Sequence, residues 1–135
     1  MKIYIGFFIC FIGLVSCSND DDTTVVMNTD LIGKWQLIEQ LVDPGDGSGT
    51  FQPVDSQLTI EFFDNGTVIS TNGSLCNMFT VSQDISSGTF SLDNNTINIG
   101  CDDDVITIFF EKNGSELILN FICIEACAQK YKKVL

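Results

Sequence analysis

Short apolar stretches separated by turn residues run along the chain from residue 31, and none of them keeps a helical period. Residues 58–62 alternate cleanly between apolar and polar positions. Asp64-Asn65-Gly66 after them is typical of a hairpin turn, because Asn and Gly tolerate the positive φ of a two-residue connection. The pattern predicts about eight to ten strands in a meander. The expected strands are 31–42, 58–62, 68–71, 76–81, 89–92, 96–99, 105–111, 116–122 and 128–134.

The first stretch fits two kinds of element. Its apolar residues Leu31, Trp35, Ile38 and Val42 recur at the spacings of three and four that a helix would use. Gly33 favours a twisted first strand instead, and the residues that follow it, including Trp35 and Leu37, also suit a strand.

A meander of this kind exposes its edges unless it closes on itself. The predicted fold is therefore all-β, a small antiparallel up-and-down barrel of about eight strands. Both faces are apolar in residues 105–110, and the neighbours Phe62 and Phe63 repeat the feature. We therefore expect a ligand, a second layer or a protein partner against part of the outer wall.

The N-terminus has the features of an export signal. Met1-Lys2 supplies a positive charge, and the apolar run 3–15, at ~1.5 Å per helical residue, is too short for a bilayer core of roughly 30 Å. Leu14-Val15-Ser16-Cys17 then resembles the lipobox of bacterial lipoproteins, which implies that Cys17 carries the lipid anchor. The predicted organisation is a signal peptide at 1–16, a lipidated acidic tether at 17–29 and one barrel domain at 30–135.

The residues after Cys17 bear on location. Ser18 at the next position resembles lipoproteins sent to the outer membrane. The acidic run 19–22 is similar to signals that carry Bacteroidetes lipoproteins to the cell surface, although a solvated tether would explain it equally well. We expect an outer-membrane lipoprotein, with surface exposure as an open alternative.

Charge narrows the range of partners. The chain has 18 acidic residues, 6 basic ones and no histidine, and its formal charge of −12 becomes −13 once Lys2 leaves with the signal peptide. A nucleic-acid backbone would be repelled by this charge. A cationic partner, a divalent cation or simple solubility fits it better.

Four cysteines remain once Cys10 is removed and Cys17 is lipidated. In an exported domain an even number favours two disulfides, and three pairings are possible. We favour the first with the second and the third with the fourth, because the latter pair would straddle a three-residue turn at the base of a hairpin. The rival reading, a four-thiolate metal site, lacks the usual CxxC spacing. The four residues are Cys76, Cys101, Cys123 and Cys127.

The sequence offers little catalytic chemistry. Without histidine, Ser/His/Asp and Cys/His catalysis are excluded, and Glu61 and Glu111 alternate with apolar neighbours as solvent-facing residues do. We predict no enzyme, no cofactor and no committed metal site. Oxygen ligands for calcium exist in two acidic loops, Asp102-Asp103-Asp104 and the glycine-rich loop with Asp43 and Asp46.

Gly33-Lys34-Trp35, at the start of the first strand, resembles the Gly-x-Trp signature of lipocalin-like proteins. The resemblance implies a lipocalin-like barrel whose tryptophan closes one end. Lipocalins stack a late arginine on that tryptophan, and here only a lysine could replace it: Lys130, Lys132 or Lys133. Residues 58–66, 76–79, 96–101 and 116–119 also resemble, in order, the META domain of envelope lipoproteins.

The resulting hypothesis is a non-enzymatic module that is held at the membrane through its lipid anchor. The lipocalin resemblance implies a small apolar ligand in the barrel mouth. The alternative is an envelope structural or interaction module with a solid core and an unknown protein partner. An interior cavity of several hundred Å3 would discriminate between the two.

Overall fold

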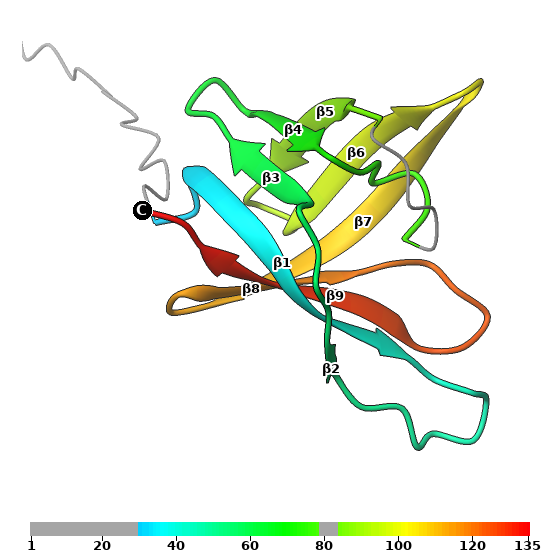
Figure 1. Cartoon of the computed structure of the whole chain (residues 1–135). Coiled ribbons are helices and arrows are strands. Elements are labelled where there is room, and N and C mark those ends of the chain that lie inside the picture. Colours follow the sequence, from blue (N-terminus) through cyan, green and yellow to red (C-terminus); the bar gives the residue numbers. More distant parts are fainter. Residues whose placement is uncertain (1–29, 79–83) are drawn as a thin grey trace, which may run out of the picture.

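The computed structural model describes residues 30–78 and 84–135, which form nine strands of one antiparallel sheet (Figure 1). Cys17 and the other expectations for residues 1–29 lie outside the described residues. The strands are β1 (Gly33–Val42), β2 (Gln52–Pro53), β3 (Thr59–Phe62), β4 (Thr67–Thr71), β5 (Ser86–Ser91), β6 (Thr96–Cys101), β7 (Asp104–Asn113), β8 (Glu116–Asn120) and β9 (Cys127–Lys133).

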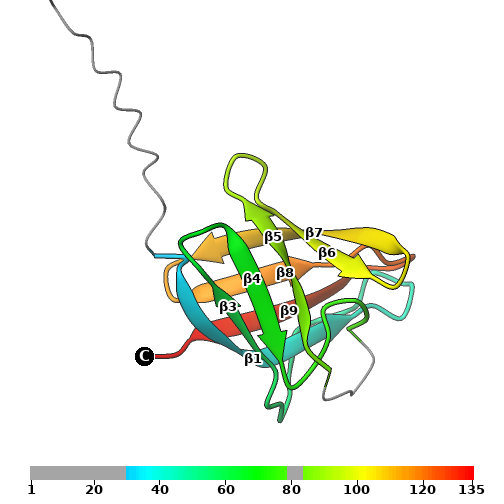
Figure 2. The same cartoon turned by 90° about the horizontal axis from the view of Figure 1, so that it is seen from above.

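The sheet closes because β1 pairs on both sides. Its first half pairs with β3, and from Trp35 to Val42 it pairs with β9, with a register shift between Leu37 and Glu39. Every other strand pairs with its neighbour in the chain, so β1 and β3 to β9 make an eight-stranded up-and-down barrel (Figure 2). The predicted fold class is confirmed.

Strand β2 is an addition that the sequence did not predict. It pairs with Glu39 and Gln40 on the part of β1 that extends beyond β3. A strand of two residues is too short to show alternation of apolar and polar positions. It also ends in a proline, which has no backbone N–H to donate to a neighbouring strand. No segment of the described chain is a helix of the length and apolarity needed to cross a membrane.

The barrel interior is filled by inward side chains that form one apolar cluster. The largest of its fully buried members are Trp35, Tyr131 and Phe62. Phe62 makes edge-on contacts with the rings of Phe90 and Phe110, at centroid distances of 5.2 and 6.2 Å. The Tyr131 hydroxyl donates to Gln129 Oε1 at 2.6 Å, and burial raises the pKa of this phenol. The hydroxyl of this buried tyrosine is therefore paired, as a buried polar group must be.

Trp35 closes the end of the barrel at which the described chain begins. Its Nε1 donates to the carbonyl of Leu31 at 2.8 Å, and Lys133 Nζ lies 5.4 Å from the ring centroid. Lys133 also donates to the carbonyl of Asp30 at 2.6 Å, which ties the last strand to the entering chain. Of the three lysines that could take the place of the missing arginine, Lys133 stacks on the tryptophan. The C-terminus lies at this same end (Figure 1).

The opposite end is covered by the segment after β4. Leu75 is fully buried in the core cluster, Met78 is buried, and Gln40 Nε2 donates to the Met78 carbonyl at 3.2 Å. The expected strand at 76–81 is wrong over its described part, because residues 76–78 are not in a strand. Side chains rather than a neighbouring strand satisfy this backbone: Ser86 Oγ accepts from the Leu75 amide at 2.9 Å and Ser74 Oγ from the Cys76 amide at 3.1 Å.

The hairpin turns differ in length from the sequence expectation. The connection between Phe62 and Thr67 has four residues rather than two, with Gly66 at φ 83° and Asn65 accepting from the Thr67 amide at 3.0 Å. Asn65 has no positive φ, so the Asn-Gly pair does not form the two-residue turn. Two-residue turns occur instead at 102–103 and 114–115, where Asp102 and Gly114 have the positive φ.

Candidate functional site

The outer wall of the barrel carries two cross-strand rows over β7, β8, β9 and β1. Inward and outward side chains alternate, so that Leu117 and Leu119 enter the core while Ile118 and Asn120 face outward. The strand registers place each outward residue beside an outward residue of the next strand. The first row is Glu111, Ile118, Lys130 and Glu39, and the second is Phe109, Asn120, Ala128 and Leu41.

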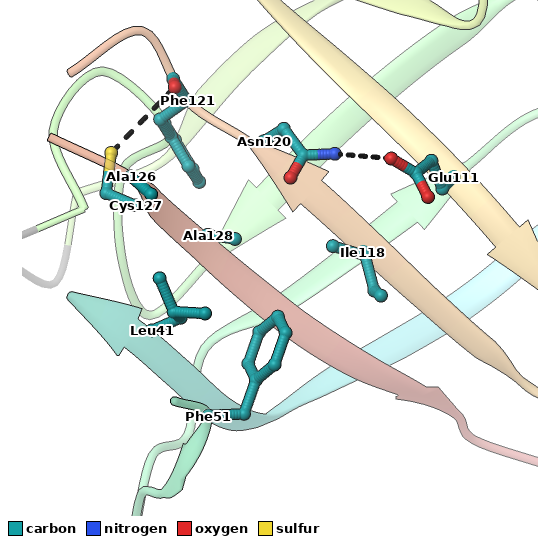
Figure 3. Close-up of a pocket in the computed structure, with 9 residues that line it drawn as sticks. All are labelled: Leu41, Phe51, Glu111, Ile118, Asn120, Phe121, Ala126, Cys127 and Ala128. Atoms are coloured by element: carbon teal, nitrogen blue, oxygen red, sulfur yellow. Dashed lines mark hydrogen bonds between the residues drawn. The ribbon is translucent and has the colours of Figure 1, made fainter. Parts of the chain in front are cut away.

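Five residues of these rows line a groove with a volume of about 300 Å3, namely Glu111, Ile118, Asn120, Ala128 and Leu41 (Figure 3). Its lining is mostly apolar, with Glu111 and Asn120 as the polar side chains. The volume is at the lower end of the roughly 300–1,000 Å3 typical of small-molecule pockets. The nine lining residues are Leu41, Phe51, Glu111, Ile118, Asn120, Phe121, Ala126, Cys127 and Ala128.

Phe51 reaches the groove from the loop between β1 and β2. Asp43 holds this loop together, because its carboxylate accepts from four backbone amides at 2.7 to 3.1 Å. A Cβ at Gly49 would lie 2.8 Å from Asp43 Cα, so the loop can close this tightly only with glycine. The Asp43 amide in turn donates to the carbonyl of Ala126 at 2.9 Å, which fixes the loop to the edge of the groove. The four amides are those of Gly45, Asp46, Gly47 and Gly49.

The same contacts argue against calcium in this loop. The hydrogen bond from Gly49, followed by those from Gly45 and Gly47, keeps the pKa of Asp43 below its ordinary value. The carboxylate is thus charged, but backbone N–H groups already use both of its oxygens. A cation would have to displace these donors, so Asp43 serves as a loop organiser.

The two charged groups of the first row that flank Ile118 have different surroundings. Lys130 Nζ pairs with Glu39 at 2.6 Å and lies 4.5 Å from the centroid of the Phe51 ring, and the bond to Glu39 raises the pKa of this ammonium. Glu111 accepts a hydrogen bond from Asn120 Nδ2 at 3.1 Å. Within the described residues Glu111 has no cation in ion-pair range. The groove therefore has a neutralised side at Lys130 and an anionic side at Glu111.

A disulfide shapes the far end of the groove. Cys123 and Cys127 are bonded across the turn between β8 and β9, and the Phe121 amide donates to the Cys127 carbonyl at 3.2 Å. Cys76 is bonded to Cys101, which joins the covering segment to the end of β6. These are the pairings that the sequence favoured.

Exposed apolar side chains continue beyond the groove. Phe109 is 51% exposed at the end of the second row, next to Asn120. The barrel end away from Trp35 carries a set that we name the apolar rim: Val42, Ile85, Val105, Ile122 and Ile124. Of the three expected covers for the outer face of residues 105–110, a second layer from the described residues is absent, since Val105 and Phe109 face solvent. A ligand or a protein partner on this face stays a prediction.

The acidic residues singled out in the sequence occupy ordinary positions. Asp102 and Asp103 form the β6–β7 turn and Asp104 begins β7, all of them exposed. Residues 30–78 and 84–135 contain no group of three or more His, Cys, Asp or Glu side chains that could hold a metal ion. Glu61 forms an exposed ion pair with Lys34 at 3.6 Å on β1 and β3, far along the wall from Glu111.

Gly33, Trp35 and the four cysteines were found from the sequence, whereas the groove was not. Strand alternation could have placed Ile118 and Asn120 on the outer face, because Leu117 and Leu119 must fill the core. No sequence signal predicts that Phe51, from a loop, would lie against Lys130.

An eight-stranded up-and-down barrel with a tryptophan buried at the end where the chain enters defines the class of small closed β-barrel domains. Residues 31–119, more than half of the chain, match the family model described as the lipocalin-like domain, so this chain belongs to the lipocalin-like family. The lipocalin part of the sequence resemblance is confirmed, and the META part stays a prediction. Comparisons with curated proteins and with solved structures found no match.

Proposed function

We propose that this chain is a lipid-anchored binding protein without enzymatic activity, and that its outer-wall groove holds a small apolar ligand. The observation that carries the proposal is the mostly apolar lining of the groove on the wall of the sheet, with one carboxylate and one amide beside it. Few polar groups in an apolar concave site are typical of ligand recognition rather than of catalysis. Membership of the lipocalin-like family, which generally comprises non-enzymatic binding proteins, agrees with this assignment.

The groove, rather than the barrel mouth, is the favoured site. Inward side chains of the described strands pack into one cluster, and Leu75 and Met78 cover the end opposite Trp35. Within the described residues, the place expected for a ligand is therefore occupied by the protein itself. The outer groove has free volume and mostly apolar walls.

Anchoring through Cys17 rests on Leu14-Val15-Ser16-Cys17. The described chain starts at the barrel end that carries Trp35 and the C-terminus, and the apolar rim lies at the opposite end. An anchor at the N-terminal side would therefore leave the apolar rim at the barrel end away from the attachment point. We expect that Cys17→Ala abolishes incorporation of a radiolabelled fatty acid and moves the protein from the membrane fraction to the soluble fraction. Cys10→Ala, in the same signal peptide, should change neither measurement, and unaltered labelling of Cys17→Ala would refute the anchor.

The groove is tested with N-phenyl-1-naphthylamine, a neutral apolar probe that fluoresces on leaving water. Ile118→Ser removes apolar area from the floor without touching the core, and we expect at least about a tenfold loss of probe affinity, from ~1.4 kcal/mol or more of lost burial. Val105→Ser, a similar but slightly smaller loss of apolar surface outside the groove, should leave the affinity within about twofold. Circular dichroism of both variants checks that the barrel is intact.

The apolar rim supplies the second candidate, a protein partner at the barrel end opposite Trp35. Its observation is the exposure of Ile122 and Ile124, at 75% and 101%, on a loop held by a disulfide. Probe binding that survives Ile118→Ser but is lost in the double variant Ile122→Ser and Ile124→Ser would move recognition from the groove to the rim and favour this candidate.

A further inference from the structure

The charges around the groove are unequal at its two sides. On the Lys130 side, the ammonium is held by Glu39 at 2.6 Å and by the face of Phe51, so the cation is already satisfied. On the other side, Glu111 is exposed, and the contact that the structure records for its side chain is the hydrogen bond from Asn120. Ile118 separates Glu111 from Lys130 in the first row, so that two strand spacings of ~4.8 Å put the backbones of these two residues roughly 10 Å apart.

This arrangement selects for the charge of a ligand head group. An anionic head beside Glu111 would be repelled by the carboxylate, and a neutral hydroxyl head would gain only a hydrogen bond. A cationic head would gain a charge–charge attraction for which no described lysine competes. The whole chain reinforces the preference, because its formal charge is −12. An apolar body extending from Glu111 over the groove would meet Ile118, Ala128 and Leu41 on the floor and Phe51 at the side.

We propose that the groove is specific for cationic amphiphiles, with an amine or quaternary ammonium head at Glu111 and an alkyl or aromatic body in the apolar part of the groove. This inference rests on the proposed function and names its ligand class. Asn120 acts as a positioning residue, because its amide donates to Glu111 Oε1 and orients the carboxylate over the wall.

The test uses three ligands with one decyl chain and different heads: decyltrimethylammonium, decanol and decyl sulfate, each kept below its micelle concentration. Each displaces N-phenyl-1-naphthylamine from the chain that lacks residues 1–17. We expect the cation to bind about fivefold more tightly than the alcohol, since ~1 kcal/mol is the attraction of unit charges ~4 Å apart in water. The sulfate should bind more weakly than the alcohol, and raising the salt from 0.05 to about 0.5 M should shrink both differences.

Glu111→Gln should bring the cation-to-alcohol ratio close to one while the affinity for decanol stays unchanged. Asp103→Asn makes the same change in net charge on an exposed turn outside the groove, and it should keep the ratio of the parent chain. A ratio that responds equally to both variants would overturn the inference, because the selectivity would then come from net charge alone.

Failure of the inference and failure of the proposed function give different results. Tight binding of the neutral probe with no preference among the three heads overturns the ligand class and leaves the groove as a site for apolar ligands. If the probe does not bind, decyltrimethylammonium is titrated directly and followed by the amide NMR signals of Ile118 and Asn120. Unshifted signals at a millimolar concentration of the ammonium ion overturn both proposals.

Discussion

Replacing Trp35 with alanine should lower the free energy of unfolding by about 3–5 kcal/mol, the largest loss that we expect from a single substitution. The side chain is fully buried, and its indole donates to the Leu31 carbonyl that would be left without this partner. A typical domain is stable by roughly 5–15 kcal/mol, so the variant should be close to unfolding at 37 °C. Urea unfolding of the chain without residues 1–17, followed by circular dichroism, measures the loss.

Two companion variants separate the packing of Trp35 from its other contacts. Trp35→Phe keeps a buried ring, so it should lose clearly less stability than Trp35→Ala. Lys133→Met keeps an apolar stem and removes the ammonium, which lies 5.4 Å from the Trp35 ring centroid and donates to the Asp30 carbonyl. Its cost should therefore combine about 0.5–1 kcal/mol for the ring contact with about 0.5–1.5 kcal/mol for the hydrogen bond. A loss below 1 kcal/mol for Trp35→Ala would show that the tryptophan does not close the barrel.

Much of the fold followed from the sequence because strand alternation is a local signal. Residues 58–62 and 116–122 alternate over a half-buried wall, and the corresponding strands are β3 and β8. The segment 76–81 was wrongly predicted to be a strand, because its apolar residues fit a strand as well as they fit a segment that covers the end of the barrel. In the structure, Leu75 and Met78 are buried by covering the barrel end, and serine hydroxyls satisfy the amides of Leu75 and Cys76. Such a segment has no period to detect.

The site was harder to predict than the fold because it depends on register. Glu111 and Ile118 are neighbours only because β7 and β8 pair residue 113 with 116, and Ala128 meets Leu41 only through the closure of β1 on β9. The sequence did show that residues 105–110 are apolar on both faces. The sequence left a ligand, a second layer and a protein partner open as the cover of the outer face, and the structure leaves Phe109 exposed beside the groove, with no second layer from the described residues.

The two disulfides should contribute unequally to stability. Cys76 and Cys101 are 25 residues apart, whereas Cys123 and Cys127 are 4 apart. In the chain-entropy model a cross-link restricts the unfolded chain more when it closes a longer loop, which gives about 3.5 kcal/mol for the first bond and about 1.9 kcal/mol for the second. Replacing both cysteines of a pair with alanine avoids a free thiol and a buried hydroxyl. The first double variant should therefore be less stable than the second by about 1.5 kcal/mol in urea unfolding.

Packing at the two pairs points in the same direction. Cys76 and Cys101 are partly buried against the core cluster, and their bond holds down the segment that carries the buried Leu75. Cys123 is exposed, so losing its bond frees a surface turn beside the groove. The Cys123→Ala and Cys127→Ala double variant should thus keep its barrel but bind N-phenyl-1-naphthylamine more weakly, because only backbone hydrogen bonds then hold Phe121 and Ala126 beside the groove. Equal losses of stability for the two double variants would contradict the loop-length argument, and unchanged probe binding would contradict the role given to the second bond.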